Sequence, residues 1–192
     1  MKPSIRFVFK NLPTLTTKRL ILRRMKWQDI SDIFEYARVP IVSQYLPWKP
    51  HASTKDTSKF MTGVLKKYTQ GKPSDWVIVW KRTKKVIGTC GFHNYNTQHN
   101  SIELGYCLKH SYWNKGIMTE AVWAVIFFVF TKLDMHRIHA RCDIENKASE
   151  GVMKKVGMKF EGILRDNAYR KKDKRYHSIK VYSILQHEYS GE

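Results

Sequence analysis

The feature that most constrains this chain is an unbroken run of apolar residues, Ala121–Phe130, inside a longer apolar segment that extends from about Ile117 to Leu133. A helix that crosses a membrane needs about 20 such residues, so the run predicts a helix buried in a folded domain. The basic segment 1–10 lacks the apolar block and the small-residue cleavage site of a secretory signal. We therefore expect a soluble, cytoplasmic protein with no membrane partner.

Length and composition favour one compact unit. A chain of 192 residues with 42% hydrophobic content can build one sizeable core, because domains commonly contain about 100–200 residues. We find no internal repeat or low-complexity linker, and the longest polar stretch, 166–176, is short enough to be a loop between strands. The sequence predicts a single domain over residues 1–192.

The cysteine content and the net charge limit the classes of function to consider. The three cysteines are widely spaced and form no CxxC pair, and no histidine spacing matches a metal site, so we expect reduced thiols and no metal. The 35 Lys and Arg residues against 16 Asp and Glu residues give a formal net charge of +19, which attracts anions. A nucleic acid, an acidic protein, a membrane surface or a polyphosphate cofactor would each suit this charge, which does not choose among them.

The order of the secondary-structure signals predicts the fold class. β-rich runs separated by polar turns predict strands at 19–23, 76–80, 86–92, 101–108, 136–142, 159–164 and 177–185. Apolar residues at three- and four-residue spacing predict helices from Trp27 to before Pro40 and at 54–68, 117–133 and 147–156. Strands first, followed by strand–helix–strand units, indicate an α/β (α+β) domain with a mixed sheet covered by helices.

One segment, His110–Ala121, carries a recognisable chemistry. It combines a strand exit, a polar loop with one glycine and the start of a helix. Backbone amides at a helix start lack partners within the helix, and the helix dipole adds roughly +0.5 of a charge there, so the main chain alone can bind a phosphate. Gly116 would allow close approach and Lys115 adds charge. An ordinary strand-to-helix turn has the same composition, so this loop by itself does not decide the function.

Five segments in order carry a resemblance. They are Leu15–Arg23, Ile102–Tyr106, Gly116–Ala121, Asn146–Ser149 and Gly157–Gly162. Together they resemble the GNAT superfamily, and within it the branch that acetylates the N-termini of ribosomal proteins. Each segment is short and weak alone, but the ordered series is specific and spans about Leu15 to Leu185.

The resemblance implies both a fold and an activity. The fold would be a single GNAT-type domain with a mixed, mostly antiparallel sheet of about seven strands, flanked by about four helices. The strand ending at Cys107–Leu108 would splay in a V from the strand ending at Arg141–Cys142. The activity would be acetyl-CoA-dependent N-acetyl transfer to a primary amine, such as a protein N-terminus, by direct attack on the thioester. By analogy, the family also suggests a homodimer.

The same resemblance implies a set of cofactor-binding residues. The pantetheine arm would lie in the gap between the splayed strands, and the amide near Leu108 would polarise the thioester carbonyl. Asn146 would bond the cofactor arm, cap the following helix, or do both. The residues assigned to the cofactor are Cys107, Leu108, Asn114, Lys115, Gly116, Ile117, Met118, Thr119 and Asn146.

Two positions depart from the family pattern. Trp113 stands where the loop usually begins with Gln or Arg, so the usual side-chain contact to the pyrophosphate has no assigned residue. Met153 stands where many members carry a tyrosine acid on the helix after the Asn motif. The protonation of the leaving thiolate must therefore come from another residue.

Three residues are candidates for the chemistry. Attack on a thioester needs a neutral amine, so a group must accept a proton from the ammonium form. Glu103, in the strand that leads to the thioester, is the predicted acceptor, acting through a water; alternatively it pairs with a surface cation. Ser149 and then Cys142 are candidates to protonate the thiolate. The alternatives are a helix-start residue for Ser149 and a small buried apolar residue for Cys142.

The acceptor side is less defined. The aromatic residues Tyr45, Trp48 and Trp76 could line an acceptor pocket or belong to the core. The positive charge should repel small cationic amines unless the pocket is locally acidic, which favours a peptide or protein acceptor.

A second hypothesis is a basic module associated with RNA or the ribosome, with weak or no catalysis. A basic run between the last two predicted strands could recruit an acidic protein or RNA, or could be a solvated hairpin. The run contains Arg165, Arg170, Lys171, Lys172, Lys174 and Arg175.

Overall fold

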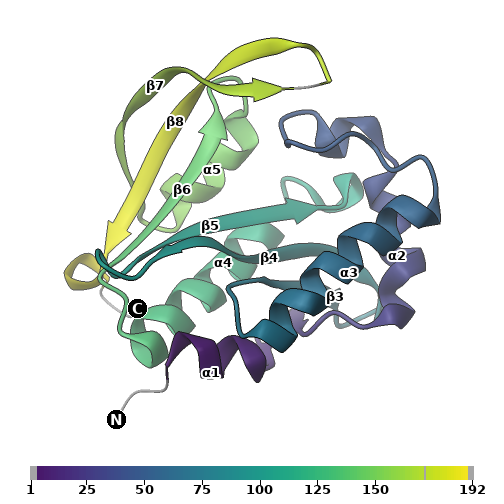
Figure 1. The fold of residues 1–192 in the computed structure, drawn as a ribbon, viewed down its shortest axis with the longest axis horizontal. Helices are drawn as coiled ribbons and strands as arrows, with labels where there is room; N and C mark the ends of the chain where they lie inside the picture. Colours follow the sequence, from purple (N-terminus) through teal and green to yellow (C-terminus); the bar gives the residue numbers. More distant parts are fainter. Residues whose placement is uncertain (1–3, 171, 190–192) are drawn as a thin grey trace.

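The computed structural model describes residues 4–170 and 172–189, which form one mixed sheet covered by helices (Figure 1). The strands are β1 Leu15–Thr16, β2 Leu20–Arg23, β3 Asp75–Trp80, β4 Val86–Asn96, β5 Ser101–Leu108, β6 Arg137–Asp143, β7 Lys159–Arg170 and β8 Arg175–Leu185. The α-helices are α1 Ile5–Lys10, α2 Ile30–Ala37, α3 Thr54–Gln70, α4 Ile117–Phe128 and α5 Lys147–Lys155. Shorter helical turns are η1 Trp27–Asp29, η2 Pro40–Ser43, η3 His110–Tyr112, η4 Val129–Leu133 and η5 Gln186–Glu188.

The eight strands follow the order β1-β2-β3-β4-β5-β6-β8-β7. Every neighbouring pair is antiparallel except β5 and β6, which run parallel. The predicted mixed, mostly antiparallel sheet is therefore confirmed. All seven predicted strands are present; the eighth, β1, and the additional helix α1 are too short to produce a periodic pattern in the sequence.

The parallel pair separates part of the way along its length. Pairing between β5 and β6 runs from Ser101 with Arg137 to Leu104 with Ala140, although β5 continues to Leu108 and β6 to Asp143. Figure 1 shows the two strands diverging. This is the predicted V-shaped splay, and it leaves one backbone edge of each strand without a neighbouring strand.

Helices cover both faces of the sheet. Trp76 and Phe92 point to one face, where the ring of Trp76 packs edge-on against Phe128 of α4. Side chains alternate along a strand, so Asp75 and His93, the neighbours of these two residues, point to the opposite face. α2 packs against β4, and α3 packs against α2. The cleft described below lies on the Asp75 face, beside the splay.

The apolar run forms a buried helix, as predicted, but it is not α-helical to its end. Most side chains of α4 are buried, including Val122, Val125 and Ile126, whereas Phe127 is half exposed. After Phe128 the chain continues as the π-helical turn η4. No helix in the described part of the chain is long and apolar enough to cross a membrane.

One sequence expectation is wrong in detail. The polar stretch 166–176 is mostly strand, because β7 continues to Arg170 and β8 starts at Arg175, so the two form a long hairpin. Its cross-strand pairs continue to the tip, with Tyr169 opposite Tyr176. Trp76 lies in the core with no exposed surface, and its indole N–H donates to the carbonyl of Pro13. Of the two alternatives considered for Trp76, an acceptor pocket or the core, the structure confirms the core.

Candidate active site

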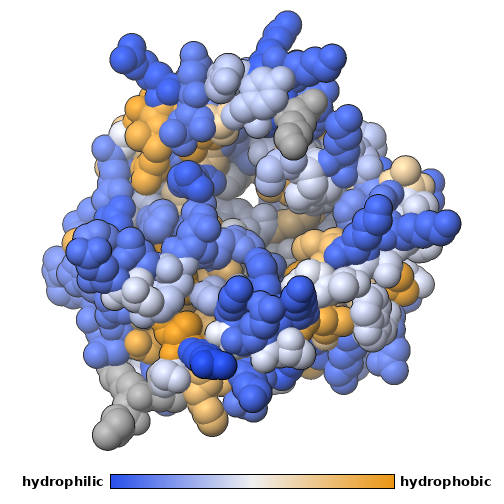
Figure 2. All heavy atoms as spheres, in the orientation of Figure 1, coloured by the Kyte–Doolittle hydropathy of each residue, from blue (hydrophilic) through white to orange (hydrophobic). Residues whose placement is uncertain are grey.

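A cleft with a volume of about 1140 Å³ opens where β5 and β6 separate. Figure 2 shows a hollow near the centre of this face, with hydrophilic side chains around it. We call one wall the loop side; it consists of Tyr106–Leu108, the 113–119 loop and helix start, and Asn146–Ser149. We call the other wall the aromatic side; it consists of Tyr36, the segment 41–48, Phe60, Asp75 and His93. Residues of both walls line the same continuous space.

The 113–119 loop has the backbone shape of an anion cradle. Asn114 and Gly116 both adopt left-handed conformations, with φ of 57° and 67°, and Gly116 is the N-cap of α4. The first backbone bond across this end of the helix runs from Glu120 N–H to Gly116 O at 3.1 Å. The amides of the first turn, before Glu120, therefore have no acceptor within the helix. Their positive ends and the helix dipole suit a phosphate.

Side chains behind the loop hold it in place. The carboxylate of Glu120 accepts hydrogen bonds from the Thr17 hydroxyl and from the Arg19 guanidinium, both at 2.6 Å. The guanidinium of Arg19 also donates to the carbonyl of Lys115 at 2.9 Å. Burial raises the pKa of Glu120, but the hydrogen bonds from Thr17 and Arg19 outweigh it and leave the pKa below its ordinary value. The start of α4 is thus tied to the first strands of the sheet.

Trp113 connects the loop to β5. Its indole N–H donates to the carbonyl of Leu108 at 2.8 Å, and its ring packs edge-on against His110. The tryptophan that replaces the usual Gln or Arg therefore braces the loop against the strand end. The carbonyl of Leu108 is occupied by this bond.

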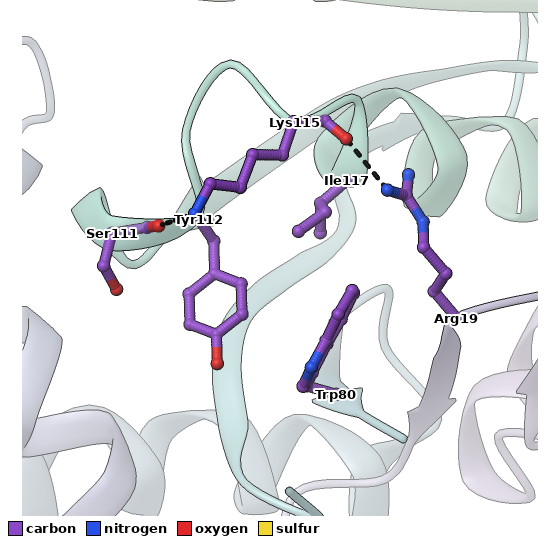
Figure 3. A pocket seen from close by; sticks show the side chains of 6 residues that line it. All are labelled: Arg19, Trp80, Ser111, Tyr112, Lys115 and Ile117. Atoms are coloured by element: carbon purple, nitrogen blue, oxygen red, sulfur yellow. Dashed lines mark hydrogen bonds between the residues drawn. The ribbon is translucent and has the colours of Figure 1, made fainter. Parts of the chain in front are cut away.

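Lys115 lies apart from the cleft. It lines a separate pocket of about 390 Å³ together with Arg19, Trp80 and Tyr112. Figure 3 shows its side chain crossing this pocket, with Nζ donating to the carbonyl of Ser111 at 2.9 Å. Its ammonium group is therefore turned away from the cleft and toward the carbonyl of its own loop.

The edge of β5 presents amides to the gap. The N–H of Lys109, immediately after β5, donates to Ile87 O of β4 at 2.7 Å. Successive N–H groups of a strand point to opposite edges, so those of Tyr106 and Leu108 point toward β6. Because β6 no longer pairs with β5 at these positions, the two amides face the open gap.

Ser149 and Asn146 meet at the start of α5. The Oδ1 atom of Asn146 accepts from the Ser149 N–H at 3.1 Å, so Asn146 does act as the N-cap. The hydroxyl of Ser149 lies 2.9 Å from the hydroxyl of Tyr106, which reaches across from β5. Burial raises the pKa of Tyr106, although the bond with Ser149 lowers it in part. The two hydroxyls are therefore hydrogen-bonded to each other in the wall of the cleft.

The two cysteines near the splay are weak acids. Burial and, to a smaller extent, the Glu150 carboxylate raise the pKa of Cys142 to about 11. Burial likewise raises the pKa of Cys107 to about 12. Both thiols therefore keep their protons at neutral pH and are poor nucleophiles.

Glu103 is tightly paired. Its carboxylate accepts two hydrogen bonds from Arg141, at 2.8 and 3.0 Å, and a third from the Asn94 amide at 2.7 Å. Burial raises its pKa, but the bonds from Arg141 and Asn94 outweigh this and leave the pKa below its ordinary value. The carboxylate stays ionised and is a weaker base than a free glutamate. This ion pair matches the alternative considered for Glu103, which is pairing with a cation. The partner, Arg141, itself lines the cleft.

His93 and Asp75 form a second acid–base group. Nε2 of His93 lies 3.6 Å from Oδ1 of Asp75. Asp75 is buried, with 6% of its surface exposed, whereas the side chain of His93 is 37% exposed. Burial raises the pKa of Asp75, and the positive charge that His93 can carry lowers it in part.

The aromatic side is closed by the β7–β8 hairpin. Arg170 donates to the carbonyl of Gln44 at 2.8 Å and lies against the ring of Tyr45. Nζ of Lys172 donates to the carbonyl of Ser43 at 2.5 Å and also to that of Gln44. Figure 1 shows the hairpin tip facing the segment after α2. The hairpin is thus fastened across one end of the cleft.

The structure brings together nearly all of the predicted site residues. The cleft is lined by Glu103, Cys107, Leu108, Asn114, Gly116, Ile117, Met118, Thr119, Cys142, Asn146 and Ser149, and also by Tyr45 and Trp48. Lys115 is the exception. Of the basic run, Arg170 belongs to the cleft wall, and Lys171 lies outside the described residues. Sequence reasoning missed Asp75 and His93, because neither belongs to a motif, and it assigned no role to Tyr106, although Tyr106 ends the Ile102–Tyr106 segment.

No group of three or more His, Cys, Asp or Glu side chains within residues 4–170 and 172–189 could hold a metal ion.

Comparison with known proteins gives consistent matches. The family model described as an acetyltransferase (GNAT) domain matches residues 19–159. The uncharacterised N-acetyltransferase p20 of Bacillus licheniformis is 32% identical over 180 residues, covering 94% of this chain and 100% of p20. A GNAT-family acetyltransferase structure from Bacillus anthracis has a TM-score of 0.81 at 27% identity, covering 92% of this chain and 100% of that one. RimL, a ribosomal L7/L12 α-N-protein acetyltransferase in complex with coenzyme A, has a TM-score of 0.79 at 20% identity, covering 90% and 98%.

Proposed function

Because this chain belongs to the GNAT family of acetyltransferases, we propose that it transfers the acetyl group of acetyl-CoA to the N-terminal α-amino group of a protein or peptide. The observation that carries the proposal is the splay of β5 and β6 beside a helix start with unpartnered amides. These two features offer a phosphate site and an extended slot within one cleft. We also propose that residues 1–192 work as a single domain.

Acetyl-CoA fits the backbone groups that the loop side presents. The amides at the start of α4 would hold the pyrophosphate, which needs several N–H donors and a positive field. The pantetheine arm would lie along β5 in the gap and bond to the amides there as an added strand does. Leu108 N–H would then polarise the thioester carbonyl as negative charge develops on its oxygen.

The hydroxyl groups in the cleft wall suit the leaving thiolate. Attack of a neutral amine on the thioester carbon forms the C–N bond and breaks the C–S bond, so the sulfur must gain a proton. The Ser149 hydroxyl, hydrogen-bonded with Tyr106 at 2.9 Å, is the proposed donor. Tyr106 on β5 thus supplies a tyrosine hydroxyl. Helix α5 supplies none, because Met153 stands at the position where many family members carry a tyrosine, and it is buried in the core. Cys142 is a second candidate, since its thiol keeps its proton.

The charged side chains of the cleft affect which amines it can bind. Asp75, Glu103, Asp143 and Glu145 line it, together with Arg141, Lys147, Lys155 and Arg170. A cationic amine therefore meets carboxylates inside a protein whose net charge is strongly positive. The ionised carboxylate of Glu103 would attract the ammonium form of the substrate. The relatives include RimL, which acts on a protein α-amino group, and this supports a peptide N-terminus as the acceptor.

Release of the CoA thiol tests the proposal. Purified protein would be incubated with acetyl-CoA and a panel of amines that includes ribosomal-protein N-terminal peptides, a polyamine and an aminoglycoside. We expect thiol release that depends on a peptide N-terminus and disappears when that terminus is already acetylated. Turnover only with small amines would overturn the acceptor assignment. The absence of both turnover and acetyl-CoA binding by calorimetry would overturn the proposal as a whole.

The alternative of a basic RNA-binding module gains no specific support. Arg170 and Lys172, two members of the basic run, donate to backbone carbonyls of the protein itself. An RNA titration at two salt concentrations separates the hypotheses, because electrostatic RNA binding weakens steeply as salt rises.

A further inference from the structure

The register of the sheet places an acid–base group beside the thioester slot. His93 is the direct cross-strand partner of Glu103, and Asp75 is the partner of Gly91. Because cross-strand partners share a face and side chains alternate along a strand, Asp75, His93 and Glu103 all project from the same face of the sheet. Cys107 projects from this face as well, two positions beyond Gly105. Three strands therefore bring two carboxylates and one imidazole to one face of the sheet, where all three line the cleft.

Gly105 makes room for the imidazole. A Cβ atom built on Gly105 would lie 2.8 Å from Nε2 and 2.9 Å from Cδ2 of His93, which is closer than atoms in contact can approach. The ring therefore lies over β5 in the space that a side chain at position 105 would fill. This position carries Nε2 from β4 over the strand that leads to Leu108. The glycine in the Ile102–Tyr106 segment thus has a physical role at the site.

Glu103 is less suited to accept a proton. Three of the sites on its carboxylate that can accept hydrogen bonds are used by Arg141 and Asn94, and the bidentate ion pair favours the ionised form. By contrast, imidazole is the side chain that exchanges a proton near neutral pH. His93 is also open to the cleft, whereas its partner Asp75 is buried behind it.

We propose that His93, with Asp75 as its positioning residue, accepts the proton that the amine must lose before it attacks acetyl-CoA. This inference rests on the proposed function. The ammonium substrate gives one proton to Nδ1 of His93, the ring nitrogen that does not face Asp75, directly or through a water, and the freed lone pair forms the C–N bond. The C–S bond breaks, and the CoA sulfur takes its proton from the Ser149 and Tyr106 hydroxyls, which are reprotonated by the proton released from the new amide nitrogen. His93 returns its proton to solvent.

Charged and titratable groups on four neighbouring elements surround the His93–Asp75 pair. Asp75 on β3 and Glu103 on β5 are negative and face the imidazole. Arg141 and His139 on β6 lie behind Glu103 and are paired with it. The Lys67 ammonium on α3 lowers the pKa of Asp75 in part, and burial together with the carboxylate of Asp75 raises the pKa of Tyr36 on α2. The imidazolium that forms would therefore lie between two carboxylates, and its charge is balanced locally.

The test is chemical rescue of His93→Ala. We expect kcat/KM for the amine to fall by about 10²–10⁴-fold, the usual contribution of a positioned general base, with unchanged affinity for acetyl-CoA by calorimetry. Added imidazole should restore activity at least tenfold, because it can occupy the vacated space over Gly105. Asp75→Asn should lower kcat by about tenfold and leave the KM for acetyl-CoA unchanged. A purely structural histidine would show no rescue.

Matched variants keep the test decisive. His93→Gln preserves the size of the side chain without a titratable nitrogen and should be as inactive as His93→Ala but resistant to rescue. His99→Ala removes an exposed histidine outside the cleft and should match the wild type. If the wild type turns over and both His93 variants stay within about twofold of it, the inference fails and the proposed function stands. If the wild type does not turn over with any amine, the proposed function fails and this inference fails with it.

Discussion

The two walls of the cleft are built in different ways. On the loop side, the groups that face the cleft are mainly backbone amides, placed by a left-handed glycine, a helix start and a separated strand pair. On the aromatic side they are side chains, including Tyr36, Asp75, His93 and Trp48, contributed by four separate segments. One wall depends on chain conformation and the other on residue identity.

This difference suggests a division of labour. A backbone cradle binds a constant ligand, because every sequence that keeps the conformation presents the same N–H groups. A wall of side chains can change with each substitution and so can select among acceptors. The comparison therefore predicts that the 113–119 loop tolerates changes of side chain but not of backbone shape, and that the aromatic side behaves in the opposite way.

The largest effect on acetyl-CoA binding is expected for Gly116→Val. The left-handed φ of 67° at this position is strained for a β-branched residue and costs roughly 1–3 kcal/mol, so we expect acetyl-CoA affinity to fall by up to about 100-fold in calorimetry. Gly63→Ala is the control, because it lies in the middle of α3 with open space around it and should stabilise the fold by about 0.5–1 kcal/mol. If Gly116→Val binds acetyl-CoA as tightly as the wild type does, the 113–119 loop is not the phosphate site.

A smaller, acceptor-specific effect is expected for Glu103→Gln. Loss of the charge removes an attraction for the ammonium group and leaves Arg141 without its bidentate partner, so kcat/KM for the amine should fall by about tenfold. Acetyl-CoA affinity should stay the same. Glu161→Gln is the matched control, because Glu161 pairs with Arg137 away from the cleft. If Glu103→Gln loses the acidic limb of the pH–rate profile and His93→Gln keeps it, the base is Glu103 and not His93.

Lys172→Met should weaken binding of the acceptor peptide and leave binding of acetyl-CoA unchanged. It removes the bonds that fasten the hairpin to Ser43 and Gln44, so the acceptor end of the cleft loosens and the KM for a peptide should rise by about threefold, since individual hydrogen bonds contribute about 1 kcal/mol. Lys174→Met, in the same turn but exposed, is the control. Equal effects of the two variants would show that only net charge matters.

The smallest effect is expected for Lys115→Met. Nζ points to the Ser111 carbonyl in the separate pocket of Figure 3, so acetyl-CoA affinity should change by less than about twofold despite the loss of a charge beside the cradle. The measurement is the dissociation constant at two salt concentrations. A tenfold loss that grows at low salt would show that the ammonium swings to the phosphates and that this wall also uses side chains.

Much of the fold was predictable because its signals are local. The spacing of apolar residues marked the main helices and strands, and the run Ala121–Phe130 marked a buried helix that the structure confirms. The segment 166–176 was misassigned because its many charges resemble a loop. In the structure, the paired β7 and β8 run on to the hairpin tip, where Arg170 is held by Asp143 and Gln44, both distant in sequence.

The sequence by itself determined the 113–119 loop. Whether Gly116 can adopt a positive φ and whether the amides after it lack partners depend on residues within one turn of the chain. Only the tertiary structure decided the rest. The Tyr106–Ser149 contact joins residues 43 positions apart, and the Arg170–Gln44 contact joins residues 126 positions apart. The His93–Asp75 pair requires the register of two neighbouring strands. Such contacts depend on how the sheet pairs and closes, and no short sequence motif records that.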